Sequence, residues 1–140
     1  MNIALWILQV LLAALFVWHG WLLVAPPAEL VELMNSQLGV GFRLFIGVAE
    51  WLAAAGLILP GITRILPQLT ALAAAGLMIV MASATVFHAL RGETGSAITT
   101  AVLWVLVTGV AYLRWQVKPI SPRTFRLALR RNLVRLGEQS

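Results

Sequence analysis

The sequence contains no cysteine and few charged residues, and each shortage excludes a class of protein. Without cysteine, the chain cannot form disulfides, thiolate metal sites, iron–sulfur clusters or a CxxC electron relay. Charged residues make up 11% of the 140 residues, whereas a typical soluble domain has about 25%. Hydrophobic residues make up 61% of the chain. This composition excludes a soluble enzyme, a coiled coil and a disordered protein, and it indicates an integral membrane protein.

Catalytic and cofactor-binding signatures are also missing. The sequence has no Ser–His–Asp set, phosphate loop or dinucleotide fingerprint. It has no Glu-x-x-His spacing, so we expect no metal site. The two histidines, His19 and His88, differ in expected depth by about 9 Å at the helical rise, which argues against one haem iron between them. The sequence leaves open whether the protein is an enzyme, and it favours an accessory or binding subunit over a stand-alone catalyst.

Four long apolar runs predict the fold. Each run is near the ~20 residues that a helix needs to cross about 30 Å of hydrocarbon. We therefore expect an all-α integral membrane four-helix bundle over residues 1–117 and a basic tail over residues 118–140. No Lys or Arg precedes the first run, so we interpret it as a retained anchor rather than a signal peptide. The expected spans are residues 3–25, 42–59, 66–90 and 96–115, with breaks at Pro26-Pro27, Pro60-Gly61, Pro67 and residues 91–95.

Two segments outside the spans have amphipathic patterns. Residues 26–38 place Leu30, Leu33 and Met34 at helical spacing beside two glutamates, which predicts a short helix along the outer membrane interface. Residues 122–136 of the tail predict a basic amphipathic helix. Such helices bind anionic lipid headgroups at about 1 kcal/mol per basic residue near the surface. We expect membrane lipids as partners of the tail, and no nucleic acid.

The distribution of positive charge predicts the orientation. Six of the ten Lys and Arg residues lie between Lys118 and Arg135. Because such residues concentrate on the cytoplasmic side, the tail should be cytoplasmic. An even number of spans then places the N-terminus on the same side. We expect a multi-pass protein of a bacterial inner membrane with both termini in the cytoplasm.

Four ionisable residues in or beside the spans are the candidate site: His19, Arg43, Glu50 and His88. An ionisable side chain at the centre of a span costs roughly 2.5–3.5 kcal/mol on insertion scales, so each needs a reason. The expected depths form two layers, with Arg43 and His88 near the outer surface and His19 and Glu50 deeper. We expect one polar pocket that opens outward.

Each of the four residues also has a structural explanation. Arg43 can reach the headgroups, His88 can be hydrated at the interface, and His19 can bond a backbone carbonyl. Glu50 is harder to explain in this way, because a carboxylate in mid-span must be paired or protonated. Arg43 and Glu50 share one helix face with Gly47 and Ala54. A hydrogen bond between His19 and Glu50 would satisfy both side chains, and Arg43 could reach the pair from above.

Small residues indicate where helices pack. Helices in lipid have no hydrophobic force between them, so small side chains that allow close approach mark the interfaces. The second span has Ala49, Ala53 and Gly56 on one side, and the third has Ala71 and Ala75. We expect these positions to face other helices.

The stretch RLFIGVAEWLAAAGLILPG, residues 43–61, resembles the DoxX-like family of small membrane proteins, as does the third span with Met81-Ala82 and His88. Arg43, Gly47 and Glu50 match positions that recur in that family. The resemblance covers roughly residues 1–117 and implies a compact four-helix bundle. It also implies several roles: small subunits of quinone-linked oxidase systems, partners of oxidative-stress enzymes, or receptor-assembly chaperones. Cysteines of some redox relatives are absent here, which weakens a thiol-linked role.

Two hypotheses for the function follow. The first is an accessory subunit of a membrane redox system that binds a quinone-like lipophile in a polar pocket beside Glu50. The alternative is a non-catalytic assembly or scaffold protein whose buried charges only specify helix packing. Both hypotheses imply a membrane or peripheral protein partner, or a homo-oligomer, and only the first implies a bound quinone.

Overall fold

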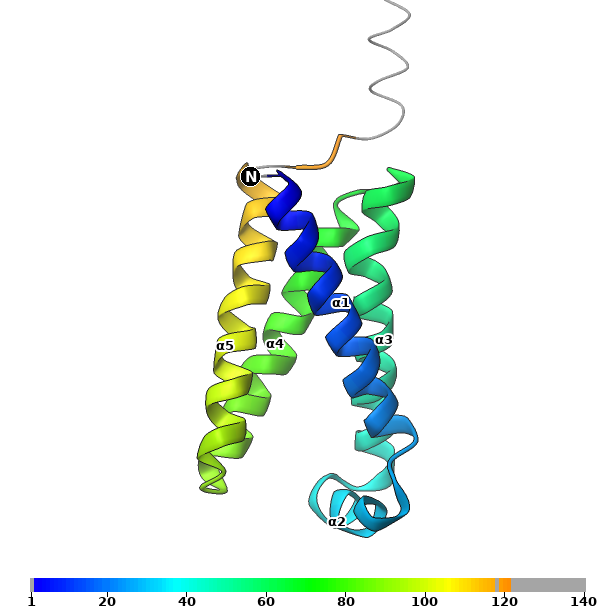
Figure 1. Ribbon diagram of the computed structural model, residues 1–140, viewed down its shortest axis with the longest axis vertical. Coiled ribbons are helices and arrows are strands. Elements are labelled where there is room, and N and C mark those ends of the chain that lie inside the picture. The colour runs from blue at the N-terminus through cyan, green and yellow to red at the C-terminus, as the bar shows by residue number, and fades with distance from the viewer. Residues whose placement is uncertain (1, 118, 122–140) are drawn as a thin grey trace, which may run out of the picture.

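The computed structural model describes residues 2–117 and 119–121 of the chain. The predicted all-α membrane bundle is confirmed, because four of its helices are long and apolar enough to cross a membrane. The predicted helix in the tail lies outside the described residues. The elements are α1 (Asn2–Val24), α2 (Ala28–Leu38), α3 (Val40–Thr63), α4 (Leu69–Leu90), α5 (Thr94–Tyr112) and a short π-helix, η1 (Leu113–Val117) (Figure 1).

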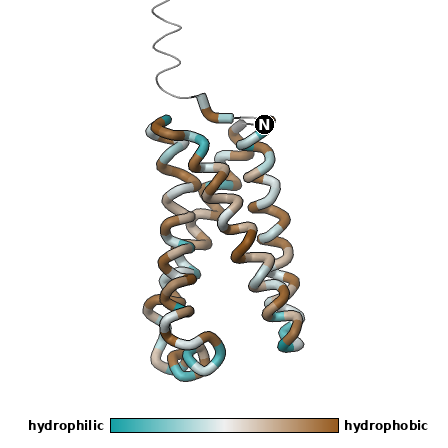
Figure 2. The backbone as a smooth tube through the Cα atoms, turned by 180° about the vertical axis from the view of Figure 1, so that it is seen from behind, coloured by the Kyte–Doolittle hydropathy of each residue, from teal (hydrophilic) through white to brown (hydrophobic). Residues whose placement is uncertain are grey.

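The bundle has two distinct ends. One end carries α2 and the turn between α4 and α5, and we call it the α2 end. The other carries the start of α1, the connection between α3 and α4, and residues 113–117 and 119–121, and we call it the tail end (Figure 1). Hydrophilic residues concentrate at α2, whereas the four long helices are largely apolar along their length (Figure 2). The short helix that we expected over residues 26–38 is therefore present as α2.

Pro60 does not end the second span, contrary to our expectation. Helix α3 continues through Pro60 and ends at Thr63. A proline is tolerated within a membrane-spanning helix where neighbouring groups satisfy the freed backbone, and here only one further turn follows it. Arg64 then adopts a left-handed conformation, with φ 58°, and its N–H bonds the Pro60 carbonyl. This bond, and not the proline ring, closes the helix.

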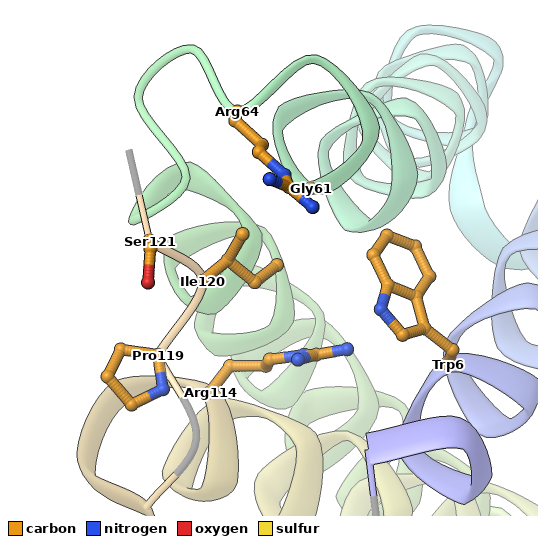
Figure 3. A pocket seen from close by; sticks show the side chains of 7 residues that line it. All are labelled: Trp6, Gly61, Arg64, Arg114, Pro119, Ile120 and Ser121. Atoms are coloured by element: carbon orange, nitrogen blue, oxygen red, sulfur yellow. The ribbon is translucent and has the colours of Figure 1, made fainter. Parts of the chain in front are cut away.

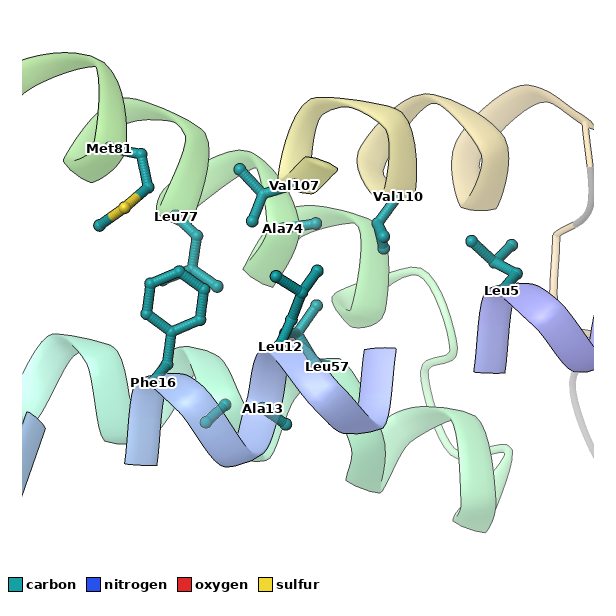
Figure 4. Close-up of a cluster of buried hydrophobic side chains, with 11 residues drawn as sticks. Leu5, Leu12, Ala13, Phe16, Leu57, Ala74, Leu77, Met81, Val107 and Val110 are labelled. Carbon is teal, nitrogen blue, oxygen red and sulfur yellow. The ribbon is translucent and has the colours of Figure 1, made fainter. Parts of the chain in front are cut away.

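The long helices form two pairs. Helix α1 packs along α3 and helix α4 packs along α5, while α3 and α4 join the two pairs. Both pairs meet toward the tail end and diverge toward the α2 end (Figures 1 and 2). The apolar core lies where they meet, and its side chains interdigitate from all four helices (Figure 4). Its most buried large members are Phe16, Leu57, Leu77, Val107 and Val110.

A pair of glycines brings α1 and α3 together. A Cβ atom added to Gly20 would lie 2.8 Å from the Gly47 carbonyl oxygen, and one added to Gly47 would lie 2.9 Å from the Gly20 carbonyl oxygen. Each backbone thus occupies the space that a side chain of the other would need. Gly56 makes a similar approach to Ala73 of α4, where an added Cβ would lie 2.7 Å from the alanine Cβ. The packing role that we expected for Gly56 is confirmed.

Replacing Gly47 with alanine should destabilise the bundle. The new methyl group would overlap the Gly20 carbonyl and the Val24 side chain, so the helices must move apart. Overpacking of this kind typically costs about 1–3 kcal/mol. Thermal unfolding of the detergent-purified protein, followed by circular dichroism, measures the effect.

The matched control is Gly76→Ala in α4. No atom lies within 4 Å of a Cβ added at Gly76, so this change should leave the protein as stable or stabilise it by up to about 1 kcal/mol through helix propensity. Equal melting temperatures for the two variants would contradict the close crossing at Gly47.

Candidate functional site

Glu50 and His19 form a hydrogen-bonded pair beside the glycine crossing. Both residues are one turn or less from the glycines, Glu50 three residues after Gly47 and His19 next to Gly20. The His19 Nδ1 atom lies 2.7 Å from Oε2 and 3.0 Å from Oε1 of Glu50. The Glu50 side chain is 1% exposed and the His19 side chain 47% exposed. The expected bond between the two side chains is confirmed.

The geometry of the pair determines what it can do chemically. If Glu50 is ionised, it can only accept, so Nδ1 of His19 must carry the hydrogen. The second ring nitrogen, Nε2, has no hydrogen bond to any described residue. In a neutral imidazole of this tautomer, Nε2 accepts a hydrogen bond, whereas in an imidazolium it donates one. The pair therefore presents one switchable polar atom on an exposed ring, anchored by a buried carboxylate.

Arg43 is buried at the α2 end and caps helix α1. The Leu23 carbonyl would normally accept the N–H of the residue four positions later, but that residue is Pro27, which has none. The Arg43 Nη1 atom donates to the Leu23 carbonyl instead and lies 3.5 Å from the Val24 carbonyl. Its Nε atom donates to Oδ1 of Asn35 in α2, at 3.0 Å. A cation at a helix C-terminus also matches the helix dipole.

His88 does not join the other three candidate residues. It lies in the last turn of α4, and its Nδ1 atom is 2.5 Å from Oε2 of Glu93 in the following turn. Arg43 likewise contacts α1 and α2, and among the described residues it makes no hydrogen bond to Glu50. The four residues thus form three separate sets of contacts: His19 with Glu50, Arg43 with α1 and α2, and His88 with Glu93. They do not gather around the single outward-opening pocket that we expected.

Sequence reasoning missed a second buried polar cluster, at the tail end. The side chain of Gln9 is fully buried and donates through Nε2 to the Leu57 carbonyl at 2.7 Å. Its Oε1 atom accepts a hydrogen bond of 2.6 Å from Nε of Arg114 in η1. The guanidinium of Arg114 also lies 5.1 Å from the centre of the Trp6 ring. The signal was present, since Gln9 is an amide within an apolar span and Arg114 falls in the last turn of another.

Two cavities adjoin this cluster at the tail end. One, of about 150 Å³, is lined by Trp6, Arg64 and Arg114 among others (Figure 3). The second, of about 210 Å³, shares Arg114 with it. Neither cavity includes His19 or Glu50. Among the described residues, no group of three or more His, Cys, Asp or Glu side chains could hold a metal ion.

The DoxX-like family matches residues 7–110 of this chain. The chain belongs to the DoxX-like family. The matched stretch contains His19, Arg43, Glu50 and His88, while Arg114 and the tail lie outside it. No curated protein and no solved structure gives a significant match. The four apolar helices and the family membership show that this DoxX-like protein is a multi-pass integral membrane protein.

In the turn between α4 and α5, neighbouring side chains lower the pKa of the Glu93 carboxyl. Hydrogen bonds from Arg91, at 2.8 Å, and from His88 hold the pKa of the Glu93 carboxyl below its usual range. Arg91 also lies over the Phe87 ring, 5.3 Å from its centre. Gly92 makes the turn possible, because its φ of 71° is one that L side chains rarely adopt. The charged groups of this turn are therefore folded back on the end of α4.

Removing the Arg43 cap should destabilise this DoxX-like protein. Arg43→Met leaves the Leu23 carbonyl and Asn35 without their donors, and loss of a charge-assisted hydrogen bond costs about 1.5–3 kcal/mol. Arg91→Met is the matched control, because it removes the same group from an exposed ion pair with Glu93, which contributes little to stability. Thermal unfolding in detergent compares the variants, and an Arg43→Met protein no less stable than Arg91→Met would refute the capping role.

The α4–α5 turn should weaken in acid. Because the folded pKa of Glu93 is lower than its ordinary value of 4.5, its ion pairs stabilise the turn fully above that value. This contribution is lost as the pH falls through the lowered pKa. Glu93→Gln removes the titrating group, so the stability difference between wild type and variant should shrink in the acid range. Amide hydrogen exchange of residues 88–95 at several pH values measures it, and a difference independent of pH would contradict the assignment.

Proposed function

We propose that this protein is an accessory subunit of a membrane redox system and that its His19–Glu50 pair binds the polar head of a quinone-like lipophile. The observation that supports the proposal is the geometry of the pair. A fully buried carboxylate fixes one ring nitrogen of His19, while the side chain of that histidine remains 47% exposed. A residue that only served packing would have no need of an exposed polar ring within an apolar span.

The chemistry of a quinone head suits this arrangement. A quinone carbonyl accepts a hydrogen bond and a quinol hydroxyl donates one, and Nε2 of His19 can serve either form by gaining or losing a proton. Glu50 stabilises the imidazolium when it forms, because its carboxylate is already in contact with Nδ1. The protonation of the histidine is then complementary to that of the ligand, because the imidazolium binds the quinone and the neutral imidazole binds the quinol.

Aromatic side chains on the same part of α1 support a ring-shaped ligand. Trp18 and Trp21 are 60% and 58% exposed and lie within one turn of His19. The Trp21 ring is 6.1 Å from that of Trp51, whose indole N–H donates to the Val17 carbonyl. Flat aromatic surfaces beside a polar group provide contacts for the two parts of a quinone head, its ring and its oxygens.

We further propose that the protein lies in a bacterial inner membrane with both termini, and hence the tail end, in the cytoplasm. Arg64 and Arg114 lie at the tail end together with the start of the basic tail. Glu29, Glu32 and Glu93 lie at the α2 end. The positive-inside rule then orients the bundle and places the His19–Glu50 pair in the outer half of the membrane.

The alternative function is that of a non-catalytic assembly or scaffold protein. Two observations favour it: both oxygens of Glu50 lie within 3.0 Å of Nδ1 of His19 in α1, and neither tail-end cavity includes the pair. In this case the bond only sets the register of α1 against α3. The two functions differ in one respect that is easily measured, namely whether a small lipophile is bound at His19.

The deciding experiment is mass spectrometry of small molecules extracted from the detergent-purified protein. His19→Asn is the sharpest variant, because an asparagine amide nitrogen can take the place of Nδ1 and keep a donor for Glu50 while Nε2 is removed. Glu50→Gln removes the negative charge from the side chain that bonds His19. Glu93→Gln is the matched control, since it removes a carboxylate that also bonds a histidine but lies in the turn outside the spans.

We expect a quinone to co-purify with wild type and Glu93→Gln and to be reduced at least tenfold in His19→Asn and Glu50→Gln. Circular dichroism and size-exclusion elution establish that the variants remain folded. Lipids alone, identical in all four proteins, would overturn the quinone proposal. If Glu50→Gln then also melted at a lower temperature, the scaffold role would be supported.

A further inference from the structure

Two arginines line the tail-end cavity of about 150 Å³. Figure 3 shows Arg64 and Arg114 at different walls of this cavity, with Trp6 beside the Arg114 guanidinium and Ser121 on the segment that also carries Pro119 and Ile120. None of its lining residues is acidic. A single water molecule needs only about 10–15 Å³ of such space, so the cavity has room for a group several times larger than water. Its chemistry is that of an anion site.

The acidic residues of the described chain lie elsewhere. Glu29 and Glu32 are in α2, Glu50 is in the α3 segment that crosses α1, and Glu93 is in the α4–α5 turn. Each of these positions is in or toward the α2 end, and the fifth acid, Glu138, lies outside the described residues. No carboxylate from the four long helices therefore competes with an external anion for the two arginines.

The Arg114 guanidinium is held in place before any ligand arrives. Arg114 is 4% exposed as a residue, its Nε atom donates to Gln9, and its guanidinium lies over the Trp6 ring. Gln9 is itself held by the Leu57 carbonyl. Arg64 reaches the same cavity from the left-handed position that ends α3. A prepositioned guanidinium loses less conformational entropy when it binds an anion than a free side chain does.

The depth of the cavity suits a headgroup. It lies where α1 begins and where the spans of α3 and α5 end. Tryptophan at such a position is typical of the membrane–water interface, and basic pockets between membrane helices bind anionic headgroups. Arginine binds phosphate through two parallel hydrogen bonds, and two arginines line this cavity.

We propose that the tail-end cavity binds a phosphate group, carried either by an anionic phospholipid of the adjacent leaflet or by a small soluble phosphate. Arg64 and Arg114 contact the phosphate oxygens, and Trp6 covers the apolar side of the site. This site is independent of the His19–Glu50 pair, which lies in the outer half of the bundle.

Binding is tested on the full-length protein in detergent. One arm is native mass spectrometry with an equimolar mixture of dioleoyl phosphatidylglycerol and dioleoyl phosphatidylcholine, which share acyl chains and differ in charge. The second arm is the thermal shift produced by inorganic phosphate, compared with chloride at the same ionic strength. Arg64→Gln removes one cavity arginine without touching the Gln9–Arg114 contact. Arg114→Gln is the second variant.

Two control variants carry the same charge change. Arg91→Gln removes a positive charge from the α2 end, and Arg131→Gln removes one from the basic tail. Arg64→Gln should weaken the preference for phosphatidylglycerol about fivefold, and more than either control does. Arg114→Gln should weaken it at least as much.

The two arms identify the source of the phosphate. A lipid preference that depends on Arg64, without a thermal shift from inorganic phosphate, assigns a phospholipid headgroup. A thermal shift that depends on Arg64, without a lipid preference, assigns a soluble phosphate. If Arg64→Gln changes neither reading more than Arg131→Gln does, the attraction belongs to the whole basic surface and the cavity proposal is wrong.

Discussion

Most of the buried polar side chains described in this bundle find a partner within the chain, which matters because lipid tails offer none. The close crossing of α1 and α3 at Gly20 and Gly47 is what makes this possible. With the two backbones in contact, side chains from one helix reach the other at successive levels. The contacts between the two helices, from the tail end to the α2 end, are Gln9 with the Leu57 carbonyl, Trp51 with the Val17 carbonyl, His19 with Glu50, and Arg43 with the Leu23 carbonyl.

The second helix pair is held by different means. Between α4 and α5 the described side-chain hydrogen bond joins two hydroxyls, those of Thr85 and Thr100, at 3.0 Å. Arg114 connects this pair to the first through Gln9 at the tail end, which is where the pairs converge in Figure 1. Polar contacts that fix geometry are therefore concentrated in α1 and α3. The proposed lipophile site and the proposed phosphate site are at different levels of the same framework.

The sequence predicted those features that depend on periodicity and on the cost of burying charge. Such arguments predicted the four spans and the short helix α2. They also predicted the shared face of Arg43 and Glu50 and the hydrogen bond between His19 and Glu50. The partner of His88 could not be predicted, because it depends on how Gly92 turns the chain back on itself. The Gln9–Arg114 contact joins residues 105 positions apart, and only the packing of the two helix pairs determines that they meet.

The position of these contacts along the chain has a consequence for the order of assembly. Both members of every α1–α3 polar contact lie within the first 63 residues. During synthesis from the N-terminus, Glu50 can therefore reach His19 before α4 and α5 have been made. The Glu50 carboxyl of α3 therefore has a hydrogen-bond partner in the membrane before the later helices are made. The contact between Gln9 and Arg114 can form only after the final helix has been made, and it then joins the two helix pairs.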